Sequence, residues 1–324
     1  MMEIYSYDPT NKLMISKDRS FLKQALQKDD AILWVDLTDP TQEETAMLFE
    51  DFRFHPLAVG DSMAQRKHPK IDDFGEYIFL VLHGPNASTS ASSEDFSTTV
   101  VDVFLSRRFL VTVHQEPLMF ITSTMDVVTK NEKLLKRGPA YVLHAIMDKM
   151  IDLYISCMDL MEDEITRLEH DVLSEGAMKN LTRIIEIKRS LHRIARINSR
   201  QKNIILKMSR GDIALVPENL QKYFRDIHDH MERIMDLADQ FRDLLTGARQ
   251  SQIVVSSSRA AEMLRVLTVI IAVFLPLFFM AFIWLLLVSW NVDLGWKIAW
   301  PVLAFLAVVF GILYIYLFKK KKWL

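Results

Sequence analysis

Two long apolar stretches near the C-terminal end constrain this chain more than any other feature. Val266 to Trp290 contains no charged residue, and a second uncharged stretch runs from Ile298 to Phe318. A helix of about 20 apolar residues crosses the ~30 Å hydrocarbon core of a membrane, so both stretches are long enough. The pattern predicts two transmembrane helices, at 266–290 and 298–318, and disfavours a buried hairpin in a soluble core.

Basic and aromatic residues around these stretches predict their orientation. Arg259 and Arg265 precede the first stretch and Lys319 to Lys322 follow the second, whereas the link between them carries Asp293 and Lys297. Cytoplasmic flanks of membrane helices are enriched in Lys and Arg, so both termini are expected in the cytoplasm and the link outside the inner (plasma) membrane. Indole rings favour the membrane–water boundary, and four tryptophans surround the link: Trp284, Trp290, Trp296 and Trp300.

Composition and motifs argue against several classes of function. The formal net charge of −2 gives no basic excess for nucleic acid, and the single cysteine, Cys157, allows neither an intrachain disulfide nor a cysteine-rich zinc site. The opening residues, MMEIYSYDPTNK, have no basic segment followed by an apolar one, so no cleaved signal is expected. The sequence shows no glycine-rich phosphate loop and no nucleophile elbow, so an enzyme is not expected.

Residues 1–138 have the mixed pattern of a cytoplasmic α/β domain. Short β-rich runs predict strands at 31–37 and 77–83, and the stretch 96–115 predicts a hairpin that turns near Ser106-Arg107-Arg108. Helices are expected after Asp39-Pro40 and near Pro117. The segment HPKIDDFGEY (68–77) places a histidine close to acids but lacks metal-ligand spacing, and a surface loop is expected there.

Residues 139–265 have the pattern of a cytoplasmic helical domain and stalk. Long helices are expected at 140–175 and 178–210, each followed by a glycine. A third helix begins at a proline–acid pair and meets no stop signal over 217–290, so the stalk is expected to continue into the membrane. Pro276 lies inside the apolar part, where a packed membrane helix tolerates proline.

Charges on the three long helices are segregated. Acids dominate 159–175 and basic residues dominate 183–210. On the third helix, six acids spaced by three or four positions share one face: Asp226, Asp229, Glu232, Asp236, Asp239 and Asp243. Two interpretations stay open, a solvated face paired with the basic helix or a rim that gathers divalent cations. His228 and His230 are two positions apart on this helix, so a zinc pair is not expected.

A helix of this length also needs lateral partners. Its apolar positions follow helical spacing, and symmetric self-association would cover them: Ile234, Leu237, Phe241, Leu244 and Leu245. In the second membrane stretch, Ala304, Ala307 and Gly311 form a ridge of small residues that permits close helix packing. We therefore expect a homo-oligomer in which the first membrane helices surround the axis.

Several segments, in this order, resemble the CorA family of magnesium and divalent-cation channels along nearly the whole chain. They are WVDL (34–37), HPLAVGDS (55–62), HPKIDDFGEYIFLVL (68–82), VFLSRRFLVTVHQ (103–115), YFRDIHDH (223–230), LRVLTVIIAVFLPLFF (264–279), WKIAWP (296–301) and the ending KKKKWL. The resemblance implies a funnel-shaped homopentamer with an α/β cytoplasmic domain, a long helical stalk and two C-terminal transmembrane helices. It also implies a pore for Mg²⁺, Co²⁺, Ni²⁺ or Zn²⁺, with the chain itself and membrane lipid as partners.

The sequence departs from the family's pattern along the pore. The family's Gly-Met-Asn signature falls on Leu285, Leu286 and Leu287, its cytoplasmic-end Asn falls on Ala261, and a polar residue after the membrane proline falls on Phe278. The implied lining has one hydroxyl: Ala261, Leu264, Thr268, Ile271, Leu275, Phe278 and Phe282. Leucine offers no oxygen to hydrated Mg²⁺, so a hydrophobic constriction is expected at the mouth. Asn291 and Asp293 are either a replacement mouth or ordinary loop residues.

The resemblance further implies a regulatory cation site between neighbouring protomers. Its two key acids fall on Asp61 and Asp226, whereas the acid that precedes the first falls on Gly60. Asp61 is otherwise a surface acid at a helix end. The function expected from these residues is divalent-cation transport, with the cation as cargo or regulator. The alternative is a non-conducting paralogue that keeps the fold and cation sensing.

Overall fold

The computed structural model describes residues 1–10, 12–64, 67–86, 96–171 and 177–289, together with isolated residues and short pieces between 301 and 319. The chain divides into two compact units, Met1–Arg249 and Gln250–Leu324. The predicted boundaries at 138 and 265 divide the chain differently and stay predictions.

The first unit contains a seven-stranded sheet with strand order β2-β1-β3-β7-β6-β5-β4. Its strands are β1 (Met2–Asp8), β2 (Lys12–Ser16), β3 (Ile32–Thr38), β4 (Lys70–Asp73), β5 (Tyr77–Pro85), β6 (Thr98–Ser106) and β7 (Phe109–His114). β3 and β7 pair in parallel, and the other neighbours are antiparallel. Most central strands are buried on both faces, which explains their nearly continuous apolar runs.

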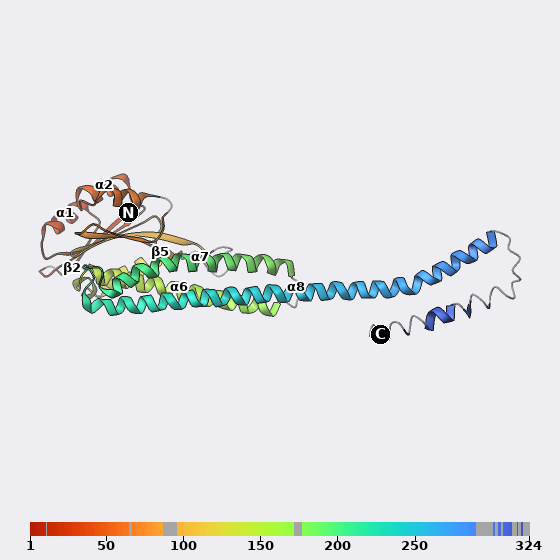
Figure 1. The fold of residues 1–324 in the computed structure, drawn as a ribbon. Coiled ribbons are helices and arrows are strands. Elements are labelled where there is room, and N and C mark those ends of the chain that lie inside the picture. The colour runs from red at the N-terminus through yellow and green to blue at the C-terminus, as the bar shows by residue number, and fades with distance from the viewer. Residues whose placement is uncertain are drawn as a thin grey trace. The chain divides into compact units, whose positions relative to one another are not determined.

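Helices cover both faces of the sheet (Figure 1). On one face lie α1 (Arg19–Gln27), α2 (Gln42–Glu50) and α3 (Pro56–Met63), which form one apolar core with the sheet. The other face packs against α4 (Met119–Lys130), α5 (Lys133–Lys136), α6 (Pro139–Asp171), α7 (Ala177–Arg210) and the first part of α8 (Glu218–Ser289). Two cores therefore sandwich the sheet, and the long helices α6, α7 and α8 run side by side in this unit.

The predicted strands at 31–37 and 77–83, the hairpin over 96–115 and the three long helices are confirmed. The surface-loop prediction for 68–77 is wrong, because Lys70–Asp73 forms β4 and pairs with Ile78–Val81 of β5. β4 is only four residues long and lies at a sheet edge, so its partly exposed, charged sequence hides the strand pattern.

The prediction that the stalk's apolar positions pack against other copies is also wrong for most of them. Ile234, Phe241 and Leu245 are buried in the core of the single chain, and Leu237 packs against that core. Leu244 is the exception, since 47% of it is exposed. The apolar stripe is therefore largely used within one chain, where the neighbouring helices of the bundle cover it.

Two buried side chains form hydrogen bonds with the backbone of His83 on β5, at a point beyond the end of the β4–β5 pairing. Beyond the reach of β4, the backbone N–H of His83 donates to Gln201 Oε1 at 2.7 Å. The hydroxyl of Tyr154 donates to the carbonyl of His83 at 2.8 Å. Since buried backbone groups are costly when unpaired, these contacts fix α6 and α7 against the edge of the sheet.

In the second unit, α8 continues without interruption through an apolar segment. Within the part of the chain that the structure describes, Ala260–Leu286 is the one helical segment long and apolar enough to cross a membrane. This agrees with the predicted first membrane helix, shifted toward the N-terminus. Much of the second predicted helix, 298–318, lies outside the described residues, so it stays a prediction.

Candidate cation sites and pore

Asp61 lies on α3, a short helix whose position is fixed from both ends. Pro56 occupies its first turn, and His55 caps it by accepting a hydrogen bond from Leu57 N–H at 3.2 Å. Beyond the C-terminal end, the Lys67 ammonium donates to the carbonyl of Ser62 at 2.6 Å and pairs with buried Asp102 on β6. Asp61 is thus held on a fixed support, with its carboxylate about half exposed.

In the Lys67–Asp102 pair, burial and the neighbouring ammonium have opposite effects on the pKa of Asp102. Burial raises the pKa of Asp102 to about 7, against the opposing effect of Lys67. His83 lies on the adjacent strand β5, and burial lowers its pKa to about 4. The imidazole of His83 is therefore neutral near pH 7.

In this structure Asp61 is already neutralised by a lysine. The Lys70 ammonium pairs with Asp61 Oδ2 and lies 2.6 Å from Asp72 Oδ2. Two carboxylates therefore converge on a single ammonium group. The sequence prediction missed Lys70 and Asp72, although their alternation in β4, at positions 70 and 72, places both side chains on one face of the strand.

Asp226 lies on α8 and is largely exposed. Its nearest ionic partner is His230, with Nε2 3.7 Å from Oδ2 at the i,i+4 spacing. The predicted cation site joins Asp61 of one protomer to Asp226 of the next, and it stays a prediction.

The six acids of the stalk are all exposed in the first unit, as their common face predicted. One of them pairs across helices, because Lys202 of α7 lies 3.0 Å from Glu232. Asp239 pairs with Arg242 of its own helix at 3.0 Å. Pairing with the basic helix therefore accounts for only part of this face, and most of its carboxylates point to solvent.

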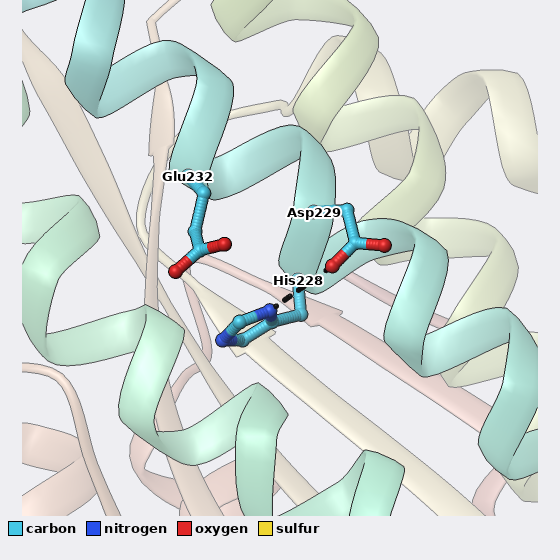
Figure 2. Close-up of side chains that lie close together, drawn as sticks. All are labelled: His228, Asp229 and Glu232. Atoms are coloured by element: carbon cyan, nitrogen blue, oxygen red, sulfur yellow. Dashed lines mark hydrogen bonds and ion pairs between the residues drawn. The ribbon is translucent and has the colours of Figure 1, made fainter.

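A histidine joins two of these acids in a small cluster (Figure 2). The potential ligand atoms of His228, Asp229 and Glu232 all lie within 4.8 Å of one another. The predicted separation of His228 from His230 holds, since His230 pairs with Asp226 instead. The cluster has the spacing i,i+1,i+4, which the sequence prediction about a histidine pair did not consider.

The implied pore-lining residues lie on α8 and are exposed in the single chain. Phe278 is 78% exposed, and Leu264, Leu275 and Phe282 are also well exposed. The Thr268 hydroxyl, the sole hydroxyl of the predicted lining, donates to the carbonyl of Leu264 at 2.7 Å. Its oxygen keeps acceptor capacity, but its proton is used within the helix.

The three leucines at the predicted mouth all lie within α8, which ends at Ser289. Leu285 is 65% exposed. The Ser289 hydroxyl donates to the carbonyl of Leu286 at 3.0 Å, so this terminal carbonyl has a local partner. Asn291 and Asp293 lie outside the described residues. The mouth assignment therefore stays a prediction for all five positions.

The fold and these residues define a class of protein: an α/β domain whose acid-bearing helical stalk continues directly into an apolar segment long enough to cross a membrane. The family model described as "CorA-like Mg2+ transporter protein" matches residues 29–321, and the chain belongs to this family. Members of the family are transporters and channels rather than enzymes.

Named relatives agree with this membership, and solved structures share the fold. The putative metal ion transporter YfjQ of Bacillus subtilis is 27% identical over 276 residues, which covers 85% of each chain. The cobalt/magnesium transport protein CorA of Thermotoga maritima is 25% identical, covering 90% of this chain and 83% of that protein. The CorA magnesium transporter of Methanocaldococcus jannaschii shares the fold, with a TM-score of 0.80, 15% identity and coverage of 99% and 98%. The full-length CmaX protein gives a TM-score of 0.77, with 14% identity and 97% coverage of each chain.

Proposed function

We propose that this protein transports divalent metal cations through a pore formed by five copies of the chain in the inner membrane. The observation that carries the proposal is the continuity of α8, which runs from the acid-bearing stalk through the Ala260–Leu286 span in a CorA-family chain. Relatives named as metal ion and cobalt/magnesium transporters support a divalent cargo. The candidates that we propose are Mg²⁺, Co²⁺, Ni²⁺ and Zn²⁺.

The membrane topology of the proposal rests on the flanking charges. Arg265 and the Lys319–Lys322 run favour a cytoplasmic location for both ends of a two-helix membrane domain. Stalk and α/β domain would then lie in the cytoplasm, where their acids meet intracellular cations.

Purified protein in sealed liposomes should pass divalent cations faster than protein-free liposomes do.

The proposed pore differs chemically from one that selects Mg²⁺ through polar groups. Its lining, from Ala261 to Phe282, contributes aliphatic and phenyl groups with the hydroxyl of Thr268 as the exception. Rings of leucine at the mouth would close the path by excluding water rather than by holding an ion. We therefore propose weak Mg²⁺ conduction and little discrimination by the mouth among hydrated divalent cations of similar size.

A regulatory cation site is proposed between Asp61 of one protomer and Asp226 of the next. Both carboxylates are exposed in the single chain, so a neighbouring copy can reach them. Lys70 already pairs with Asp61, and a divalent cation has to compete with this ammonium. The lysine therefore sets a threshold concentration below which Asp61 stays paired within its own chain.

Millimolar Mg²⁺ should protect the folded assembly from proteolysis, and Asp226→Ala should abolish most of that protection. A cation at ten times its Kd, bound only by the folded assembly, stabilises it by about 1.4 kcal/mol. Lys70→Gln should shift protection to lower Mg²⁺ concentration because it removes the competing charge. Asp239→Ala, an exposed acid of the same stripe, is the matched control and should behave like wild type. Equal protection of wild type and Asp226→Ala would leave Asp226 as a surface charge.

A further inference from the structure

The ligand atoms of His228, Asp229 and Glu232 all lie within 4.8 Å of one another, close enough to share one ion. His228 Nδ1 lies 3.4 Å from Asp229 Oδ1, which is longer than a favourable N–H···O hydrogen bond. Two ligands on a tetrahedral cation with bonds of about 2.0–2.1 Å are separated by roughly 3.4 Å. The observed spacing of this pair therefore suits two ligands of one metal ion.

The histidine of the cluster is largely buried, whereas its two carboxylates are exposed. The side chain of His228 is only 13% exposed, whereas that of Asp229 is 68% exposed. Glu232 lies one helical turn further along the same face and is 51% exposed. Packing thus orients the imidazole, while the two carboxylates leave the cluster open for an ion that keeps water ligands.

The ion pair between Lys202 and Glu232 does not prevent Glu232 from binding a cation. Lys202 contacts Glu232 through Oε1 at 3.0 Å. A carboxylate has two oxygens with about four acceptor positions, so Oε2 of Glu232 can bind a metal while the ion pair persists. The exposed acids Asp226 and Asp236 lie within about two turns of the cluster on the same stripe and raise the local concentration of cations.

We propose that His228, Asp229 and Glu232 form a binding site on the stalk helix for a divalent transition cation of the Zn²⁺ or Co²⁺ class. Imidazole favours zinc and its neighbours in the first transition row, whereas Mg²⁺ favours an all-oxygen octahedral shell. The site binds one ion per chain and discriminates against Mg²⁺. None of its three ligands belongs to the proposed regulatory site or to the pore lining, so failure of this site would leave both of those proposals unchanged.

Cobalt spectroscopy tests this site directly. The full-length protein, purified without a polyhistidine tag, is titrated with Co²⁺ and followed by its visible absorption, then by Zn²⁺ displacement and calorimetry. We expect one Co²⁺ per chain that Zn²⁺ displaces and millimolar Mg²⁺ does not, in addition to any Co²⁺ held at the Mg²⁺-sensitive regulatory site. His228→Ala should weaken binding at least tenfold, and Glu232→Gln should weaken it severalfold, while both proteins melt like wild type.

Two control variants separate this site from its neighbours. His230→Ala removes the other histidine of the segment, and the Asp61→Ala, Asp226→Ala double variant removes the proposed regulatory site. His230→Ala should bind Co²⁺ as the wild type does, and the double variant should keep the Co²⁺ that is lost in His228→Ala. Unchanged affinity in His228→Ala would overturn the proposal, as would a cobalt–thiolate absorption band, which would place the ion on Cys157.

Discussion

Mg²⁺ flux through the protein should rise about tenfold or more when Leu285→Gly, Leu286→Met and Leu287→Asn are combined with Phe278→Thr. The leucines offer Mg²⁺ no oxygen, whereas the new asparagine adds an amide from each copy at the mouth. Glycine permits the backbone to turn there. Phe278 must change as well, because its ring is 78% exposed on the proposed lining and five such rings would obstruct the axis. Fluorescent indicator dye inside liposomes measures the flux.

A matched variant separates the effect of the asparagine amide from the effects of the turn and of the wider pore. A protein with Leu285→Gly, Leu286→Met and Phe278→Thr keeps the turn and the wider pore, but it retains Leu287. Its Mg²⁺ flux should stay near that of the Phe278→Thr protein. If the Asn-containing variant conducts no better than this control, the mouth is not where Mg²⁺ is captured. In that event Asn291→Ala in the unmodified protein should stop whatever flux it has.

Gly84→Ala should lower the free energy of unfolding of the first unit by about 1–3 kcal/mol. A Cβ at Gly84 would lie 2.4 Å from Cε1 and 2.7 Å from Cζ of Phe120, with Met150 Cγ at 3.3 Å. Phe120 is only 1% exposed, so its ring has no free space into which to move. Thermal melting of the detergent-solubilised protein measures the loss.

A second substitution distinguishes overpacking from a backbone effect. Phe120→Leu shortens the obstructing side chain, so the Gly84→Ala, Phe120→Leu protein should lose less stability than the sum of the two single variants. Gly60→Ala is the matched control, since nothing lies within 4 Å of its Cβ position and Gly60 lies inside α3. It should be neutral or slightly stabilising. Strictly additive losses would show that Phe120 is not the obstacle.

The long elements were predictable because their patterns are long. Helices α6, α7 and α8 carry apolar periodicity over many turns, and buried strands such as β5 are continuous apolar runs. The short N-terminal elements escaped prediction. β2 and α1 are only five and nine residues long, so their sequences hold few repeats of either period.

For the candidate sites, the sequence predicted which kinds of side chain are present, but not which residues contact one another. Helical spacing placed the stalk acids on one face, and that face is exposed as expected. The pairing of Lys70 with Asp61 depends on β4 lying beside α3, and the contact of Lys202 with Glu232 depends on how α7 packs on α8. Contacts of this kind between distant segments follow from tertiary packing, which single-sequence periodicity does not encode.

The most direct test of the account is cation flux by the unmodified protein in sealed liposomes, compared for Mg²⁺, Co²⁺, Ni²⁺ and Zn²⁺. The account predicts flux above that of protein-free liposomes for divalent cations, with weak Mg²⁺ flux and rates that differ by less than about tenfold among ions of similar hydrated size. Leu285→Trp, which adds bulk at the proposed mouth, should reduce all of them together. Robust Mg²⁺-selective flux would contradict the apolar mouth, and no divalent flux from correctly folded protein would contradict transport itself.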